Sequence, residues 1–419
     1  MRAGTIVATN YLEMARLLGR SFLAAHPDAT FVVLLVDDHP VDVAADSIEV
    51  VRLGDLDLDD DTLDLMRTIY DVMELSTAVK PAFLRHLLRD DDLVCYIDPD
   101  IYVYRPFDDL VEPARSIGIV LTPHVLTPIP RDGLAPSERM IMQAGVFNLG
   151  FIAVGRPASG FLEWWQERLV LDAVNDVGSN LFTDQRWIDW VPALFEYTVC
   201  RDPGMNIAWW NIHERPLERL GDDVLVDGHP VRFVHFSGYS PRTPEVLSKH
   251  HGPTPRTPHT GVMRELADEY GRRLGASGHD ERIGTPYQWG RTEDGIVLTS
   301  AIRTSLRTAL LGGEVAGSEV VDLDASVPRA FGPRSAGLRS WLVAPGSDHF
   351  SRVEVALWES RADLRAAFPD REGVDADRFR DWLERDPGAV DALGDLVQRP
   401  AVAVRPTGRR QRLRAVFGR

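Results

Sequence analysis

The sequence predicts an α/β protein whose C-terminal region is mostly helical. Residues 4–8 and 31–37 are short apolar runs of the kind that form buried strands, and residues 11–27 between them carry an amphipathic helical pattern. This β-α-β unit is typical of a parallel sheet with crossover helices. The composition changes at residues 241–261, where Pro, His, Thr and Gly dominate, and this change marks a domain boundary.

The other elements follow from apolar runs and from apolar spacing. Continuous apolar runs predict strands at residues 93–97, 101–104, 116–124, 146–155 and 231–239. Apolar residues at helical spacing predict helices at residues 62–75, 77–88, 160–170, 184–195 and 263–275. The Asp-rich residues 55–64 are expected to form a loop. We therefore divide the chain into an α/β domain (1–255), a linker with a helix (256–285) and an accessory region with a basic tail (286–419).

Composition and charge exclude several classes of protein. A content of 44% apolar residues is that of a globular protein, and a net charge of −17 argues against binding to nucleic acid. The N-terminus lacks the pattern of a signal peptide, and no apolar run is long enough to span a membrane, so a cytoplasmic location is expected. Cys95 lies in a predicted strand and is expected to be a structural thiol.

The last fifteen residues are basic, with six Arg and no acid. A solvated terminus is the plain interpretation of this tail. The alternative is weak contact with an anionic membrane surface, which would place the protein at the inner face of the membrane.

Asp98 and Asp100 differ from the other acidic pairs of the chain in what precedes them. The same Asp-x-Asp spacing occurs at six other places, all in polar loops or at helix ends, whereas this pair follows an apolar strand. Carboxylates held together at a strand end repel each other, and a divalent cation relieves the repulsion because Mg²⁺ and Mn²⁺ prefer oxygen ligands. The alternative is a turn in which Asp98 accepts hydrogen bonds from backbone amides ahead of Pro99.

The acidic pair belongs to a wider pattern of motifs. In chain order the sequence contains "IVATNYLEM", "YIDPDIYVY", "FNLGFIAV", "TDQRWID" and "VHFSG". Together these motifs resemble those of GT-A glycosyltransferases, in particular the retaining family 8 group that uses nucleotide-sugar donors. The resemblance covers roughly residues 1–250 and implies a GT-A (Rossmann-like) mixed sheet flanked by helices.

This resemblance implies a metal site. Asp98, Asp100 and His235 would hold a divalent metal at the diphosphate of the donor. An imidazole ligand suits Mn²⁺ better than Mg²⁺, so Mn²⁺ is the expected cofactor and Mg²⁺ the second choice. The alternative for His235 is a histidine satisfied within the core, because it shares a strand face with Val231 and Phe233.

The resemblance also implies a donor site. The residues matched to nucleoside contacts are Thr9, Asn10 and Tyr11, with Tyr11 packing on the base. Asn148 and Gly238 stand in matched motifs, and Asn148 is expected to bond the sugar or to orient the metal ligands. Lys80, a long cation in a mainly apolar segment before the metal strand, is expected to contact a phosphate or the sugar. Lys249 is the nearest candidate for the family's lysine at the diphosphate. The family's His-Phe-x-Gly motif is usually followed closely by Lys-Pro-Trp. Here the nearest lysine, Lys249, stands eleven residues past Gly238, and Asn10 occupies the position of a family acid.

Asp184 and Gln185 are the catalytic residues that the resemblance implies, with Gln185 stabilising an oxocarbenium-like centre. Asp184 is equally suited to cap a helix. Lys80 has the alternative of a snorkelling surface lysine. Trp209 and Trp210 could form a platform for the acceptor sugar or a buried pair in the core.

The expected function is transfer of a hexose from a nucleotide sugar, with a UDP-linked sugar as the expected donor, to a glycan, lipid-linked or small-molecule acceptor with retention. One alternative is a metal-dependent nucleotidyltransferase or nucleotide-sugar hydrolase, which shares an acidic metal site. The other is a non-catalytic subunit that binds a nucleotide sugar.

Overall fold

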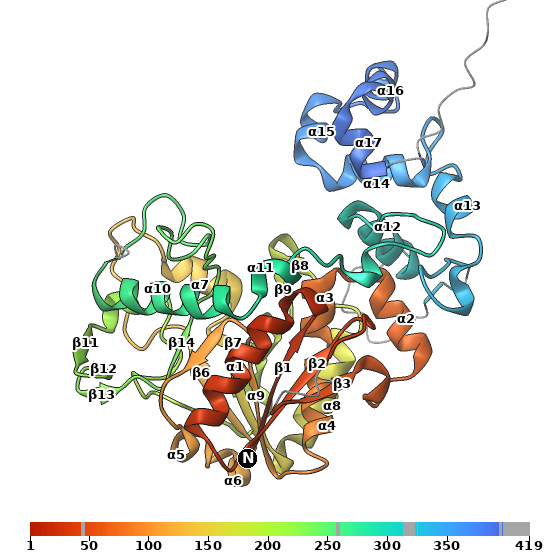
Figure 1. Ribbon diagram of the computed structural model, residues 1–419. Coiled ribbons are helices and arrows are strands. Elements are labelled where there is room, and N and C mark those ends of the chain that lie inside the picture. Colours follow the sequence, from red (N-terminus) through yellow and green to blue (C-terminus); the bar gives the residue numbers. More distant parts are fainter. Residues whose placement is uncertain (43–46, 257–259, 313–322, 325, 394–395, 397–419) are drawn as a thin grey trace, which may run out of the picture. The chain divides into compact units, whose positions relative to one another are not determined.

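The computed structural model describes residues 1–42, 47–256, 260–312, 323–324, 326–393 and 396 (Figure 1). The chain forms two compact units, Met1–Ala336 and Gly337–Arg419. Residues 286–336 thus belong to the first compact unit. The predicted assignment of residues 1–255, 256–285 and 286–419 to a catalytic domain, a linker and an accessory region stays a prediction. The basic tail, with its predicted membrane contact, lies outside the described residues.

The first unit is built on a mixed seven-stranded sheet, as predicted. The strand order is β10-β6-β7-β4-β1-β2-β3, and β7 runs antiparallel to both of its neighbours while the other pairs are parallel. The strands are β1 (Arg2–Val7), β2 (Thr30–Leu35), β3 (Glu49–Arg52), β4 (Leu93–Ile97), β6 (Ile119–Pro123), β7 (Phe147–Gly155) and β10 (Thr198–Val199).

Helices cover both faces of this sheet because its central strands are apolar on both sides. On one face, Phe22 of α1 (Leu12–Ala25) shares a core with Ala3 of β1 and Cys95 of β4. On the other face, Phe83 of α4 (Lys80–Leu87) packs on Gly4, where an added Cβ would lie 2.5 Å from the ring. Helix α8 (Ser159–Leu169) packs beside α4.

Smaller sheets extend from the end of the main sheet. Strand β5 (Ile101–Val103) follows the acidic turn and pairs antiparallel with β14 (Phe233–His235). The remaining strands are β8 (Asn175–Asp176), β9 (Leu181–Phe182), β11 (Leu217–Leu220), β12 (Asp223–Val226) and β13 (His229–Pro230). The two-stranded β5-β14 sheet matters most, because it brings residues 98–100 and 235 together.

The remaining helices of the first unit are α2 (Asp60–Ile69), α3 (Val72–Ala78), α5 (Asp108–Val111), α6 (Ala114–Ile117), α7 (Glu138–Ala144), α9 (Val191–Leu194), α10 (Gly261–Ala276), α11 (His279–Arg282) and α12 (Ser300–Leu310). The second unit contains α13 (Leu338–Val343), α14 (Arg352–Ser360), α15 (Ala362–Ala367), α16 (Ala376–Arg385) and α17 (Pro387–Leu393), so the C-terminal region is helical as predicted. No helix among the described residues is both long and apolar enough to cross a bilayer.

Several predicted elements differ in detail. The helix predicted at residues 62–75 is divided into α2 and α3, and residues 116–117 of the strand predicted at 116–124 belong to α6. The acidic loop ends early, because Asp59 caps α2 by accepting the Thr62 N–H at 2.8 Å and the helix begins at Asp60. The helix predicted at residues 184–195 is a short 3-10 turn, Arg186–Trp190, followed by α9. Cys95 is buried and free, as expected of a structural thiol.

Candidate active site

The turn that carries the acidic pair ties the main sheet to the β5-β14 sheet. The Asp98 N–H donates to the Gly150 carbonyl of β7 at 2.7 Å, and the Phe236 N–H donates to the Asp100 carbonyl at 2.9 Å. Among the described residues, the Asp98 carboxylate accepts the Tyr96 hydroxyl at 2.7 Å and no backbone amide. The alternative of a turn stabilised by the Asp98 side chain is therefore wrong.

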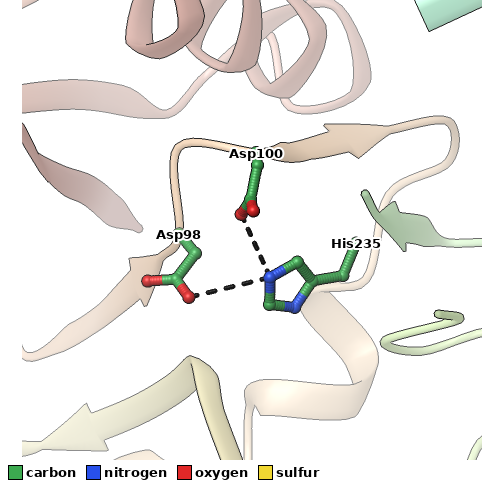
Figure 2. A group of neighbouring side chains, drawn as sticks. All are labelled: Asp98, Asp100 and His235. Carbon is green, nitrogen blue, oxygen red and sulfur yellow. Dashed lines mark ion pairs between the residues drawn. The ribbon is translucent and has the colours of Figure 1, made fainter. Parts of the chain in front are cut away.

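His235 completes an acidic cluster with the two aspartates (Figure 2). Strand register sets its position, because His235 pairs with Ile101 directly after the turn. The His235 Nε2 lies 3.0 Å from Asp100 Oδ1 and 3.7 Å from Asp98 Oδ2. One ligand atom from each of the three residues lies within 4.8 Å of the others. Two carboxylate oxygens and one imidazole nitrogen could hold a divalent cation.

The charges of the cluster are strongly coupled. Burial opposes the charge of His235, but Asp100 and Asp98 outweigh it, so the pKa of the imidazole lies above its ordinary value. Burial raises the pKa of Asp98 despite Lys80 and His235, and Asp100 adds to the rise. For Asp100, burial is outweighed by His235, and its pKa lies below the ordinary value. The two carboxylates therefore differ: burial disfavours the charge of Asp98, whereas the imidazole favours the charge of Asp100.

Gly150 leaves the space that the His235 ring occupies. A Cβ added at Gly150 would lie 2.3 Å from His235 Cε1 and 2.9 Å from Asn148 Oδ1. Trp210 closes another side of the ring with an edge contact at 5.2 Å and is itself buried. Trp210 therefore packs in the core beside the cluster, as in the predicted alternative of a core pair, while Trp209 is only partly buried.

Gln185 and Asn148 lie beside the cluster and are held by the protein. The Gln185 Oε1 accepts the Leu149 N–H at 2.9 Å, and its Nε2 donates to the Ala144 carbonyl at 2.8 Å. Asn148 Nδ2 lies 3.4 Å from Gln185 Oε1. The Gln185 amide is thus fixed in one orientation, with both of its polar atoms bonded.

Lys80 and Asp184 form a buried ion pair. Lys80 Nζ lies 2.5 Å from Asp184 Oδ2, donates to the Leu149 carbonyl at 3.1 Å and stands 4.0 Å above the Tyr96 ring. Both side chains are about 2% exposed. The expected alternatives were therefore wrong for both residues: Lys80 is not a surface lysine, and Asp184 pairs with Lys80 instead of capping a helix.

The loop matched to the nucleoside site lies near the acidic cluster. The Thr9 N–H donates to Asp37 Oδ2 at 3.0 Å, and the Thr9 hydroxyl also bonds this carboxylate. Asn10 Oδ1 is buried without a hydrogen-bond partner among the described residues. The Tyr11 ring is 41% exposed, and burial together with the charge of Asp100 raises the pKa of its hydroxyl.

A later segment packs on this loop, which the sequence did not reveal. The His279 ring meets Tyr11 edge-on at 6.2 Å. Gln288 Oε1 accepts the Asp38 N–H at 2.7 Å, and Trp289 Nε1 donates to the Val36 carbonyl at 2.7 Å. Residues 279–289 therefore border the nucleoside loop, although they lie beyond every motif of the resemblance.

The stretch after the last motif places a histidine near the cluster. Gly238 has a positive φ of 73°, and a Cβ there would meet His250 Cδ2 at 2.6 Å. Burial and the neighbouring Lys249 lower the pKa of His250, while the charge of Asp100 opposes them, so His250 lies within electrostatic reach of Asp100. Lys249 is exposed and its N–H donates to the Gly238 carbonyl at 3.0 Å. The sequence could have indicated His250, because it directly follows the candidate lysine Lys249.

Comparisons with known proteins found relatives in sequence and similar solved structures. No protein-family model matches the chain. The uncharacterised protein YfnF of Bacillus subtilis is 28% identical over 251 residues, which cover 56% of this chain and 80% of the relative.

Two solved glycosyltransferases are also similar in structure. The galactosyltransferase LgtC in complex with donor and acceptor sugar analogs has a TM-score of 0.38 at 15% identity, covering 66% of this chain and 96% of that chain. The glycosyltransferase GlyE of Streptococcus pneumoniae TIGR4 has a TM-score of 0.37 at 12% identity, covering 70% of this chain and 66% of that chain. Neither similarity assigns an activity to this chain.

Proposed function

We propose that this chain is a metal-dependent glycosyltransferase that moves a hexose from a UDP-linked sugar to a glycan, lipid-linked or small-molecule acceptor with retention. One observation carries the proposal: Asp98, Asp100 and His235, far apart in sequence, present their ligand atoms within 4.8 Å of one another. They do so beyond the carboxyl end of a central strand, where open α/β sheets bind ligands.

The cluster supplies the electrostatic part of the reaction. A divalent cation bound there would neutralise the charge that develops on the departing diphosphate. Asp98 and Asp100 supply oxygens and His235 a nitrogen, which is a donor set that suits Mn²⁺ better than Mg²⁺. Because the two carboxylates are partly exposed and the ring is buried, the cluster is open on the aspartate side.

The residues around the cluster would bind the two ends of the donor. Thr9, Asn10 and Tyr11 lie at the nucleoside end, and the exposed Tyr11 ring is available to pack on a base. Gly238 and Lys249 would border the diphosphate, and Asn148 the sugar. Lys80 acts through Asp184, whose carboxylate it neutralises and holds in place beside the sugar.

The proposed transfer follows a front-face route. The bond between the anomeric carbon and the diphosphate oxygen breaks, and the acceptor hydroxyl oxygen bonds to the same face of that carbon. The hydroxyl proton passes to the departing diphosphate. Asp184 and Gln185 would lie beside the anomeric carbon, where a carboxylate and an amide oxygen stabilise oxocarbenium-like charge.

Nucleotide binding is the first prediction. Thermal unfolding of the full chain with UDP, GDP, ADP and dTDP, each with and without Mn²⁺, should show a Mn²⁺-dependent shift with UDP. A ligand at 100 times its Kd adds about 2.7 kcal/mol, which raises the Tm of a domain of this size by roughly 2–4 °C. The absence of a shift with all four nucleotides would contradict the donor site.

Product analysis separates the alternatives once a nucleotide is known. NMR of the anomeric proton should show the configuration of the donor retained in the product. Release of free hexose and UDP at the full rate without an acceptor would favour a hydrolase. A nucleotide-dependent shift without turnover on any acceptor would favour a binding subunit.

The affinity for Mn²⁺ is expected to rise with pH. The pKa of His235 lies above its ordinary value in the folded protein, so a proton must leave the ring before Nε2 can bind a cation. Below that pKa the affinity should fall by up to about tenfold per pH unit, and above it the affinity should level off. Mn²⁺ titrations followed by EPR would measure the slope. His235→Gln should remove most of it, and a flat profile in the wild type would contradict the prediction.

A further inference from the structure

Asn206 stands directly behind the His235 ring. Its side chain is completely buried, and its backbone has a positive φ of 55°, a conformation that favours Asn, Asp and Gly. The backbone beside it is fixed to β14, because the His235 N–H donates to the Ile207 carbonyl at 2.8 Å. Asn211 Nδ2 also donates to the Asn206 carbonyl at 2.9 Å. The Asn206 side chain therefore meets the imidazole in a rigid setting.

The amide of Asn148 has only one orientation that its neighbours allow. The Gly150 N–H, which can only donate, lies 3.2 Å from Asn148 Oδ1. On the opposite side, Gln185 Oε1 is an acceptor because it receives the Leu149 N–H, and it faces Asn148 Nδ2 at 3.4 Å. The oxygen of Asn148 thus points to Gly150, and its nitrogen points to Gln185.

His124 supports the same orientation. Its Nδ1 lies 3.2 Å from the Val146 carbonyl, which can only accept, so Nδ1 carries the proton. Burial lowers the pKa of His124 to about 4, and the ring is neutral. Its Nε2 is then an acceptor and lies 3.3 Å from Asn148 Nδ2.

The orientation of Asn148 fixes that of Asn206. Because Asn148 Oδ1 accepts, the Asn206 atom 2.9 Å from it must be the donor Nδ2, which also lies 3.2 Å from the Thr122 hydroxyl. The Oδ1 of Asn206 is therefore turned to His235 Nδ1, at 3.3 Å. A carbonyl oxygen at that place requires a proton on Nδ1.

We propose that Asn206 is a positioning residue that keeps the proton on Nδ1 of His235 when the ring is neutral, so that Nε2 is the nitrogen left to bind a cation beside Asp98 and Asp100. The orientation of Asn206 follows from the hydrogen bonds alone. Its benefit for metal binding rests on the proposed function. In the other neutral tautomer, Nε2–H would donate to Asp100 and satisfy the cluster without a cation. Asn206 disfavours that state, because the lone pairs of Nδ1 and Oδ1 would then face each other. The cluster is thereby kept ready for a cation.

Two substitutions separate positioning from simple packing. Asn206→Asp keeps an acceptor at His235 Nδ1, whereas Asn206→Gly removes it, and both suit a positive φ. Both lose the donor to Asn148 and Thr122. In Mn²⁺ titrations followed by EPR, the Gly variant should bind about 10- to 100-fold more weakly than wild type, and the Asp variant within about threefold of wild type. Equal losses in both variants, or none in the Gly variant, would overturn the inference.

A spectroscopic measurement tests the tautomer without a metal. In the metal-free full chain with ¹⁵N-labelled histidine, long-range ¹H–¹⁵N correlations distinguish the two neutral tautomers, and His235→Gln identifies the resonance. We expect a protonated Nδ1 for His235 once the ring is neutral. A protonated Nε2 would overturn the inference even if wild type binds Mn²⁺. If wild type binds no Mn²⁺, the metal site of the proposed function is wrong. The NMR measurement still determines the tautomer of His235 in that case.

Discussion

Lys80→Met is expected to destabilise the first compact unit by about 3–5 kcal/mol. The substitution leaves the Asp184 carboxylate, which is 2% exposed, without the cation that lies 2.5 Å from it. A buried charge without a partner keeps its full cost of desolvation, and the total stability of a domain is only about 5–15 kcal/mol. Urea unfolding followed by tryptophan fluorescence would measure the loss.

The chain offers matched controls for this prediction. Lys249 is the only other lysine in the sequence and is exposed, so Lys249→Met should change the free energy of unfolding by less than about 0.5 kcal/mol. Lys80→Met combined with Asp184→Leu removes both charges and should recover most of the lost stability. A loss below about 1 kcal/mol in the single variant would contradict the prediction. No recovery in the double variant would show that the loss does not come from the unpaired charge of Asp184.

The strands were predictable because their residues are apolar without interruption. Residues 93–97 are apolar throughout apart from the Tyr96 hydroxyl, and Asn148 is the only polar side chain in residues 147–155, which is the pattern expected of buried strands. The position of Asp98 and Asp100 at the end of β4 followed from the same pattern. The cluster with His235 was predicted from the resemblance, and the register of β5 with β14 explains why the three side chains meet.

The hydrogen-bond partners were not predictable, because they join residues far apart in sequence. Asp184 precedes a polar turn and looks like a cap, but its actual partner is Lys80, which lies on α4, far earlier in the chain. Asn206 lies in no motif, and its role depends on Asn148 and Gln185 both being oriented by backbone groups. Neither fact leaves a local pattern in the sequence.

The contacts of the segment 279–289 were not predictable for a related reason. Its sequence has the polar, turn-rich character of a linker, and it lies beyond the matched motifs. Its contacts include an ion pair of Arg282 with Glu13, a ring edge at Tyr11 and hydrogen bonds to residues 36, 38 and 39, all more than 240 positions away. Only the folded chain shows that it borders the nucleoside loop.

Asp100→Asn is expected to lower the rate of glycosyl transfer by at least about 10³-fold. Asp100 lies 3.0 Å from His235 Nε2 and has a lowered pKa, so its negative charge is present throughout the working pH range. The amide keeps the shape of the side chain but removes one of the charges that would hold the cation. The variant should also lose the Mn²⁺-dependent thermal shift with UDP. Donor turnover assays and Mn²⁺ titrations would measure both effects.

Asp90 and Asp92 provide the decisive control, because they have the same spacing at the opposite end of β4. Both are exposed and pair with surface arginines, Arg2 and Arg115. Asp92→Asn should leave Mn²⁺ binding and transfer unchanged and cost at most about 1 kcal/mol. If it impaired transfer as much as Asp100→Asn, the loss in Asp100→Asn would not support a metal site at residues 98–100. The carboxyl end of β4 differs because Gly150 and Asn206 hold an imidazole against the two carboxylates there, and no comparable group faces Asp90 and Asp92 among the described residues.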